Sequence, residues 1–589
     1  MKRQLSVVTA LVAGAALLLS ACGSDSKTTS SDSSGPAATG SSAAGTESSA
    51  AGSDAGSSSA APAEATGGVI LANGTEPQNP LIPSNTNEVG GGRIIDNIFA
   101  KLVYYDAKGE THMEAAESIE TTDSKTFTVK LKAGQKFTDG EPVTSASFID
   151  AWNFGADVTN AQLSSYFFDP IEGFADVNYC EKDAGPPDKK GKATCLPAPK
   201  AKTMSGLKKV DDTTFTITLT EAQSDFPLRL GYSAFAPLPT SAFKDIKAFG
   251  ENPVGNGPYM LSGPGSWEHN VKIDLVPNPD YTGDRKPQNG GLTFTFYQAY
   301  EAAYSDLQSN LLDVIDGIPP GSLTSYETDL PGRSVNQPAA VFQSFTVPAR
   351  DPHFSGEEGN LRRQAISMAI NRDEITKIIF SGTRTPASDF TSPVIAGWSD
   401  SLKGADVLKF NADGAKKAWA AANAISPWDG KFTIAYNSDG GHKEWVDAVS
   451  NSIKNTLGID AEGKPYASFA ELRTQVTDRS IEGGFRTGWQ ADYPSVSNFL
   501  GPIYKTGAGS NDGDYSNPEF DKLLGEGSAA KTVEEGNKFY EQAQEILLKE
   551  LPAIPLWYSN VTGGFSTNVS NVQFGWDSQP IYYAIQKKA

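Results

Sequence analysis

The sequence predicts an α/β protein that is built from more than one lobe. Its 589 residues exceed what a single hydrophobic core normally organises, so two or three lobes are expected. Stretches with strand-like alternation are interleaved with stretches at helical spacing, and no regular repeat relates them. The chain is also acidic, with a formal net charge of −21, so nucleic acid is not expected as a partner because its phosphates would be repelled.

Residues 1–21 have the pattern of an export signal. Lys2 and Arg3 precede the short apolar run LSVVTALVAGAALLL, which is too short for a comfortable membrane span. The stretch LSAC that follows resembles the lipobox of bacterial lipoproteins. This resemblance implies cleavage before Cys22 and attachment of lipid to its thiol. The alternative is a plain secretion signal with a chance cysteine.

Residues 22–66 are predicted to be a lipid-anchored cysteine followed by a flexible tether. The segment is nearly all Ser, Ala, Gly and Thr and has no aromatic residue, so it cannot bury enough surface to order itself. A coil of this length has a mean reach of about 35–40 Å. We therefore expect the folded part to be anchored to the outer face of the cytoplasmic membrane without spanning it.

The remaining cysteines predict a disulfide. Cys180 and Cys195 flank a loop rich in Pro, Gly and Lys, and an exported protein encounters an oxidising environment. Zinc is the weaker alternative, because there is no CxxC and the histidines are widely scattered. We expect no metal and no cofactor. The histidines are His112, His269, His353 and His442.

Local patterns predict several elements of the folded part. Residues 126–132 and 214–220 alternate apolar and polar side chains, which is typical of half-buried strands. Residues 361–370 have helical spacing, and a second helical stretch begins at Asp373. A last helix is expected from the Thr532–Glu535 capping box to the proline at 552.

The sequence contains none of the common enzyme signatures. GxSxG, HExxH, GxxxxGK[ST] and a GxGxxG between strand and helix are all absent. Carboxylates are plentiful, but no particular pair is marked as a glycosidase site. These observations argue against an enzyme without excluding a cell-surface hydrolase.

The chain resembles the extracytoplasmic solute-binding proteins of ABC importers, in the family 5 class that binds oligopeptides and dipeptides. Several stretches match that family in order, and the similarity extends from about residue 69 to the C-terminus. The stretches are NGTEPQNPLIP to KLVYYD (73–106), FTVKLKAGQKFTDGEPVTSASFIDAW (127–152), NPVGNGPYML to DRKP (252–287), LRRQAISMAINRDEI (361–375), GWQADYPSVSNF (488–499) and IPLWYS (554–559).

The resemblance implies the type II fold of periplasmic binding proteins, in which two hinged lobes close over a ligand and a third lobe is inserted. Domain I would be discontinuous, domain II would be the insert, and domain III would follow. The expected boundaries are 67–106, 206–335 and 553–589 for domain I, 107–205 for domain II and 336–552 for domain III.

The resemblance also assigns the main contacts to a peptide. Asp492, which follows Trp489 in an aromatic segment, would receive the peptide α-ammonium. Gly488, Trp489 and Gln490 would form a backbone rail, which fits the indifference of main-chain pairing to side chains. The alternative for Asp492 is a cap of the turn that enters PSVSNFL.

Residues from other segments complete the expected site. Asn87, Glu88 and Val89 align with the second rail. Arg486, His442 and Arg473 match positions that meet the carboxylate of peptides of different lengths. The alternatives are surface ion pairs for the arginines and a solvated helix start for the histidine. Tyr466 and Tyr166 are expected to line side-chain pockets, or else to belong to the core.

The resulting hypothesis is a lipid-anchored, monomeric receptor that captures peptides and delivers them to the permease of an ABC importer, and that catalyses nothing itself. The nearest alternatives are the same fold with a non-peptide solute and a peptide-signal receptor. An acid at the position of Asp492 favours an ammonium over a neutral sugar.

Overall fold

A computed structural model describes residues 67–182, 184–185, 195–297, 299–438, 441–467 and 469–588. The predicted signal peptide, Cys22 and the tether lie outside the described residues, so those predictions stay untested. In the part that is described, every helix is too short or too polar to cross a membrane.

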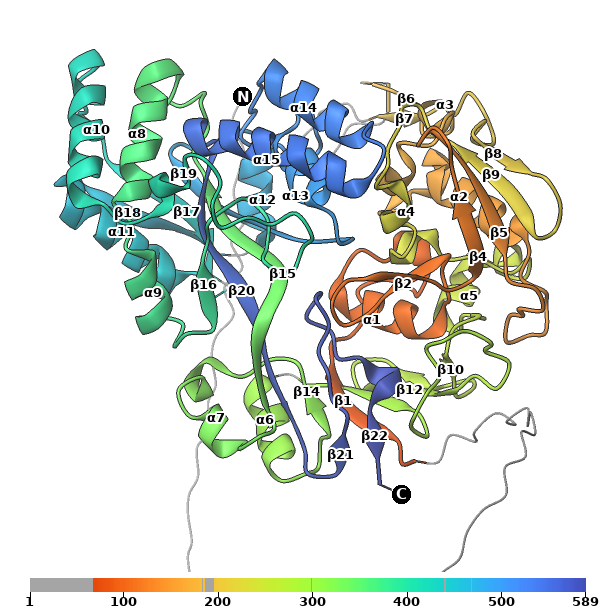
Figure 1. The fold of residues 1–589 in the computed structure, drawn as a ribbon. Helices are drawn as coiled ribbons and strands as arrows, with labels where there is room; N and C mark the ends of the chain where they lie inside the picture. The colour runs from red at the N-terminus through yellow and green to blue at the C-terminus, as the bar shows by residue number, and fades with distance from the viewer. Residues whose placement is uncertain are drawn as a thin grey trace, which may run out of the picture. The chain divides into compact units, whose positions relative to one another are not determined.

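A large mixed sheet runs through the described chain (Figure 1). Its strands pair both in parallel and antiparallel fashion, as the predicted α/β class requires. In sheet order they are β10 (Tyr259–Leu261), β12 (Lys272–Pro277), β13 (Leu292–Phe296), β1 (Ile70–Gly74), β14 (Val314–Ile315), β20 (Ala553–Phe565), β15 (Ser334–Thr346), β19 (Gly484–Gln490), β17 (Phe432–Asn437) and β18 (Ala461–Tyr466), while β11 (Trp267–Glu268) pairs with β12 and β16 (Arg384–Pro386) pairs with β20.

The long strands β15 and β20 connect the two halves of this sheet. They pair antiparallel from Ser334 opposite Gly564 to Thr346 opposite Ala553, with an irregularity between Pro338 and Phe342. The first half of β15 pairs with the end of β20 that also pairs with β14. The second half of β15 pairs with β19. Figure 1 shows both strands running from the group around α6 and β14 to the group around β19.

Smaller sheets surround the large one. The two predicted strands are β5 (Thr126–Leu131) and β9 (Thr214–Thr218), and they pair with each other with alternate residues buried. Both predictions are confirmed. The other strands are β4 (Ala116–Glu120) and β8 (Leu207–Lys209) in the same sheet, the pair β2 (Val103–Tyr105) and β3 (Thr111–Met113), the pair β6 (Cys180–Glu181) and β7 (Leu196–Pro197), and the pair β21 (Val569–Ser570) and β22 (Gln586–Lys587).

The predicted disulfide is present. Cys180 and Cys195 are bonded, with their Cα atoms 5.7 Å apart, and the bond closes the pair β6–β7. A crosslink over this separation stabilises the folded state by about 3 kcal/mol in the chain-entropy model.

The helices cover the sheets, and their ends follow local capping chemistry. They are α1 (Val89–Ile98), α2 (Ser145–Ala156), α3 (Phe174–Val177), α4 (Phe226–Arg229), α5 (Ile246–Glu251), α6 (Tyr300–Gln308), α7 (Tyr326–Asp329), α8 (Gly356–Met368), α9 (Arg372–Ile378), α10 (Ala412–Ile425), α11 (Lys443–Leu457), α12 (Phe469–Thr477), α13 (Val496–Tyr504), α14 (Pro518–Ser528) and α15 (Val533–Glu550). The last helix is capped by Thr532, whose hydroxyl accepts the N–H of Glu535 at 3.2 Å, as the capping motif predicts.

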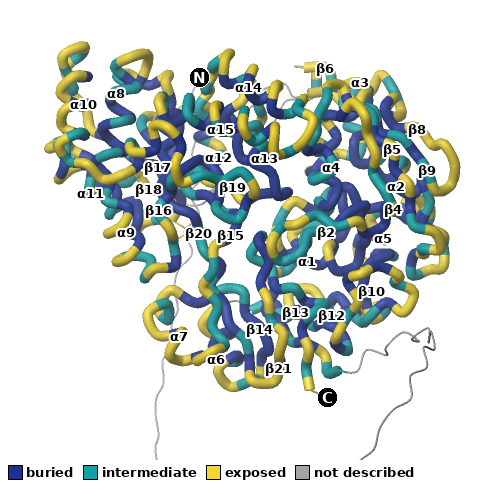
Figure 2. The backbone as a smooth tube through the Cα atoms, viewed as in Figure 1, coloured by how far each residue is buried: buried dark blue, intermediate teal, exposed yellow. Residues whose placement is uncertain are grey.

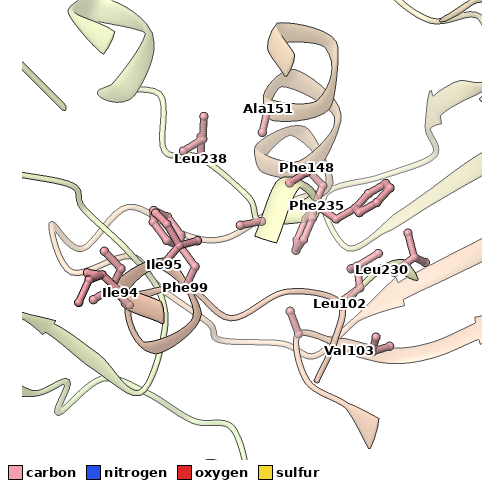
Figure 3. Packing of buried hydrophobic residues seen from close by; sticks show 14 of the residues in the cluster. Ile94, Ile95, Phe99, Leu102, Val103, Phe148, Ala151, Leu230, Phe235 and Leu238 are labelled. Carbon is pink, nitrogen blue, oxygen red and sulfur yellow. The ribbon is translucent and has the colours of Figure 1, made fainter. Parts of the chain in front are cut away.

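Separate hydrophobic cores hold the elements in place, and Figure 2 shows buried backbone along the strands with exposed outer helices. In the largest core, Ile94, Ile95 and Phe99 of the α1 segment pack toward Phe148 of α2 and Phe235 (Figure 3). This packing fixes the orientation of α1. The opposite face of the helix is therefore turned toward the site described next.

Candidate ligand-binding site

A cavity of about 330 Å³ lies between α1, the end of β19 and the segment that leads to β22. Its lining combines aromatic and charged side chains, as ligand sites commonly do. The lining residues are Thr86, Asn87, Glu88, Val89, Gly92, Arg93, Asp96, Asn97, Tyr104, Tyr105, Asp106, Gly231, Tyr232, Ser233, Arg285, Gln490, Ala491, Asp492, Trp576, Asp577, Gln579, Pro580, Ile581, Tyr582 and Tyr583.

Helix α1 contributes one stripe of its surface to this cavity. Val89, Gly92, Arg93, Asp96 and Asn97 all line the cavity, and they recur at the spacing of a single helix face. The apolar face packs into the core on the other side. The amphipathic pattern of this one helix therefore fixes which side chains reach the site.

At Gly488 and Gln490, strand β19 pairs with β15 and with no second strand of the described residues. Residues 485–490 pair with β15 on one side, whereas β17 pairs only with Gly484 and Phe485 on the other. The N–H of Ala491 donates to the carbonyl of Ala340 in β15, at 3.0 Å. Because N–H and C=O groups alternate between the two edges of a strand, Gly488 and Gln490 direct theirs away from β15. Both of these residues are exposed, so an extended ligand has access to this edge.

The loop after β19 positions Asp492 at the cavity wall. Asn498 of α13 accepts the backbone N–H of Asp492 at 2.9 Å and donates its amide to the Asp492 carboxylate at 3.0 Å. The same amide oxygen accepts the indole N–H of Trp489 at 3.1 Å. The helix α13 is capped by Ser495, whose hydroxyl accepts the N–H of Ser497. Ser495 is therefore the cap of α13, and the Asp492 carboxylate accepts the side-chain amide of Asn498 without capping the N-terminus of this helix.

The carboxylate of Asp492 lacks a cationic partner within the described part of the chain. It is half-buried and accepts the amide of Asn498, but it forms no ion pair with a described Lys, Arg or His. Burial raises the pKa of this carboxyl from 3.8 to about 6, although the Asn498 hydrogen bond and the charge of Arg229 oppose the rise. The site thus holds a carboxylate that a ligand cation would stabilise.

The predicted second rail also lies at the cavity. Asn87, Glu88 and Val89 line it, and Glu88 has an extended backbone with φ −135° and ψ 159°. The Glu88 carboxylate caps α1 by accepting the N–H of Gly91 at 2.8 Å. Val89 is already the first helical residue, so the extended part of this segment ends at Glu88.

Several predicted residues lie elsewhere than the cavity lining. Arg473 pairs with Asp512 at 2.6 Å, as its surface ion-pair alternative predicts, and Arg486 donates to the side chain of Asn437 at 2.7 Å. His442 precedes α11 and accepts the indole N–H of Trp445 at 3.0 Å.

The remaining predicted contacts are aromatic or belong to the strand itself. Tyr466 ends β18 and packs against the small core around Leu472 and Phe485. Tyr166 is 54% exposed and its ring lies 4.5 Å from that of Phe167, centroid to centroid. Gly488 and Trp489 belong to the β19 edge without lining the cavity.

Sequence reasoning missed the aromatic and C-terminal parts of the lining. Tyr104, Tyr105 and Tyr232 contribute rings, and burial followed by the charge of Asp492 raises the pKa of the Tyr232 hydroxyl. Asp577 and Tyr582 come from the segment GWDSQPIYYA. This segment has several aromatic residues around one acid, as the segment at 485–500 does. That composition is the sequence signal that could have identified it as part of the site.

One group of side chains in the described residues has the spacing of a metal site. Ligand atoms of Asp106, Glu110 and His112 lie within 4.8 Å of one another. Asp106 accepts the backbone N–H groups of Lys108 at 2.8 Å and Glu110 at 2.9 Å, and it contacts His112 at 3.2 Å. These hydrogen bonds are those of the turn that connects β2 and β3, and the turn explains why the three side chains lie together.

Comparison with known proteins identifies the family to which the chain belongs. The profile described as bacterial extracellular solute-binding proteins, family 5 Middle, matches residues 110–511. The periplasmic oligopeptide-binding protein OppA of Haemophilus influenzae is 27% identical over 514 residues, covering 83% of this chain and 87% of OppA. The probable deoxycholate-binding periplasmic protein YgiS of Escherichia coli is 26% identical over 504 residues, covering 83% of this chain and 88% of YgiS.

The fold has solved counterparts. The unliganded open form of MppA, the murein tripeptide binding protein of Escherichia coli, superposes with a TM-score of 0.71 at 22% identity, and the match covers 89% of this chain and 99% of MppA. This similarity confirms the predicted α/β fold of the type II periplasmic binding proteins. Several relatives are described as oligopeptide-, dipeptide- or murein peptide-binding proteins, and the family consists of substrate carriers and not of enzymes. The family profile spans more than half of the chain, and the protein therefore belongs to family 5 of the bacterial extracellular solute-binding proteins.

Proposed function

We propose that the protein is a lipid-anchored receptor that captures peptides outside the cytoplasm and delivers them to the permease of an ABC importer. Asp492 would receive the α-ammonium, and the free edge of β19 would pair with the peptide main chain. The lipid would be attached to Cys22, and residues 22–66 would tether the folded part to the membrane. The protein would act as a monomer.

The observation that carries this proposal is the carboxylate of Asp492 beside an unpaired strand edge. A half-buried carboxylate without an ion-pair partner among the described residues is unfavourable unless a ligand supplies a cation. A strand edge exposed at Gly488 and Gln490 offers main-chain hydrogen bonds to any extended peptide. Together they match a ligand with one ammonium group and a repeating amide backbone.

Other predicted contacts remain part of the proposal. Asn87 and Glu88 would face the ligand from the side of α1, opposite the edge of β19. Arg486, His442 and Arg473 would meet the carboxylate end of peptides of different lengths. Arg473 would first have to exchange its present partner Asp512 for the ligand. Tyr466 and Tyr166 would contact ligand side chains.

Closure of the lobes is the proposed response to ligand. We place domain I at 67–106, 206–335 and 553–589, domain II at 107–205, and domain III at 336–552. The irregular pairing between Pro338 and Phe342 lies where β15 passes from one half of the sheet to the other, which favours this point as the hinge.

A non-peptide solute is the second candidate, because one relative is described as a probable deoxycholate-binding protein. The tyrosine-rich lining would suit a ligand with a large apolar surface. However, deoxycholate is an anion, and the carboxylates of the lining disfavour an anionic ligand. The charge of the site therefore supports the peptide.

Mass spectrometry of the small molecules that copurify with the protein tests the proposal. The protein is purified without refolding, denatured, and its released ligands are identified, with a heat-refolded and dialysed sample as the blank. We expect peptides with free amino termini. Recovery of a bile acid or another non-peptide solute at stoichiometric amounts would overturn the peptide assignment.

A further inference from the structure

Negative groups outnumber positive groups in the cavity lining, and some of the negative groups have no neutralising neighbour among the described residues. Five carboxylates and two guanidinium groups line it, and both guanidinium groups already donate to acceptors of the protein. The carboxylates are Glu88, Asp96, Asp106, Asp492 and Asp577, and the guanidinium groups are Arg93 and Arg285.

Every nitrogen of the two arginines already donates to an acceptor of the protein. Arg93 donates to the carboxylate of Asp316, to the carbonyl of Asn73 at 2.9 Å and to the side chain of Gln579 at 2.7 Å. Arg285 donates to Glu114 at 2.6 Å and to the carbonyl of Phe99 at 3.0 Å, and its remaining nitrogen contacts Asp96. An anionic ligand would therefore compete with the internal acceptors of both arginines.

Three of the five carboxylates are stabilised by hydrogen bonds or ion pairs with neighbouring groups of the protein. Glu88 caps the N-terminus of α1. Asp96 forms ion pairs with Lys101 and, at 3.3 Å, with Arg285. Asp106 is held by its turn and by His112. What remains is Asp492 and Asp577.

The loop that carries Asp577 contacts the end of β19 through its backbone. The side chain of Gln490 donates to the backbone carbonyl of Asp577 at 3.4 Å, and the carbonyl of the preceding Trp576 accepts the N–H of Ala340 at 2.7 Å. Ala340 in turn accepts the N–H of Ala491, so the loop with Asp577 is attached beside the residue that precedes Asp492. The backbone of the Asp577 loop is thus attached to the end of β19, and Asp492 and Asp577 line the same cavity.

Among the described residues, the carboxylate of Asp577 accepts hydrogen bonds only from the backbone. It accepts the N–H of Gln579 at 3.0 Å and forms no ion pair with a described Lys, Arg or His. The charged groups that face it are Asp96 and Arg93. Burial and, to a lesser extent, Asp96 raise the pKa of the Asp577 carboxyl to about 6, against the opposing effects of the Gln579 N–H and Arg93.

Tyr582 provides an independent sign of a polar ligand group. It lines the cavity and is only 4% exposed, and its hydroxyl forms no hydrogen bond with any described residue. Burial raises its pKa, and the charges of Arg93, Asp316 and Asp577 act on the same hydroxyl. A buried hydroxyl without a partner is unfavourable, and an N–H donor brought by a ligand would satisfy it.

We propose that Asp577 and Tyr582 form a second cation subsite, so that the protein prefers peptides with a lysine or arginine side chain near the amino terminus. The inference rests on the proposed peptide-binding function and specifies the class of peptide. The ammonium or guanidinium group donates to the Asp577 carboxylate and to the Tyr582 hydroxyl oxygen, while the α-ammonium occupies Asp492.

Isothermal titration with matched tripeptides tests this subsite. Each pair carries lysine or its uncharged isostere norleucine at position 1 or at position 2, with alanine elsewhere. We expect the lysine peptide of at least one pair to bind about tenfold to a hundredfold more tightly, as for a charge-assisted hydrogen bond. Asp577→Asn should abolish this preference, so that the lysine and norleucine peptides of each pair bind with equal affinity, whereas Tyr582→Phe should reduce the preference severalfold.

A matched control and a stability measurement make the result interpretable. Asp400→Asn removes the same charge from an exposed position outside the cavity lining and should keep the preference for lysine. Thermal unfolding should show Asp577→Asn to be at least as stable as the parent protein, because it removes a carboxylate that burial disfavours. Binding of all peptides without a preference for lysine would overturn the subsite alone, and failure of all of them to bind would overturn the proposed function with it.

Discussion

Replacing Asp492 by Asn separates a ligand-binding carboxylate from a structural one. The change keeps the shape of the side chain and the hydrogen bond from Asn498 but removes the charge. If a peptide ammonium meets this carboxylate in a closed cleft, losing one partner costs about 3–5 kcal/mol because the other charge is left buried alone. The affinity for a free peptide should then fall by roughly two to three orders of magnitude, at about 1.4 kcal/mol per tenfold.

The same substitution should stabilise the protein without ligand. The carboxyl titrates near 3.8 when unfolded and near 6 when folded, so the folded state binds the extra proton between these values. Stability therefore falls as the pH rises through this window, and the loss is complete above about pH 6. Removing the charge should recover about 2–3 kcal/mol of unfolding free energy at neutral pH.

Titration calorimetry with a free and an N-acetylated peptide completes the test. Acetylation should cost the parent protein about as much affinity as the substitution does. It should cost the Asp492→Asn protein much less, since the interaction is already gone. Additive losses, or a variant that is less stable and binds as before, would refute the ammonium assignment.

The other predictions concern the surroundings of this carboxylate and the anchor. The affinity for free peptides should decrease as the pH falls below about 6, where the Asp492 carboxyl becomes protonated, and a flat profile in calorimetry between pH 5 and 8 would contradict this. Gly488→Ala places a Cβ 2.9 Å from the carbonyl oxygen of Phe342, so it should weaken the binding of every peptide equally, acetylated or not. As a control, Gly525→Ala in the open interior of α14 should leave the affinity unchanged and add about 0.5–1 kcal/mol of stability. Asn498→Ala leaves the N–H groups of Asp492 and Trp489 without their acceptor and should cost about 1–3 kcal/mol in chemical unfolding; no change would show that this residue does not fix the loop. Cys22→Ser should abolish labelling by a fatty-acid analogue and membrane retention, and a labelled, membrane-bound variant would reject the lipoprotein hypothesis.

Elements with a strong local pattern could be predicted from the sequence. Strands β5 and β9 alternate strictly, and in the structure both begin at the predicted residue and end one and two residues before the predicted end, respectively. Helix α8 begins at Gly356, before the first apolar residue of the pattern, because its exposed first turn carries Glu357 and Glu358 in place of apolar residues. Periodicity reports which residues are buried and is silent on an exposed helical turn.

The candidate site was predictable only where one segment carried the information. Asp492 and the β19 edge lie within a few residues of each other, so their relation is visible in the chain. Arg473 pairs with a residue 39 positions away, and Asp577 reaches Gln490 across 87 positions. Such contacts depend on how the sheet closes, and no local pattern records them.

A crystal structure of the protein with a bound tripeptide is the most direct test of the central claim. We expect the α-ammonium within about 3 Å of a carboxylate oxygen of Asp492, as for a charge-assisted hydrogen bond. The peptide main chain should pair with the N–H and C=O groups of Gly488 and Gln490. A peptide whose amino terminus lies away from Asp492, or one that leaves the β19 edge unpaired, would contradict the account.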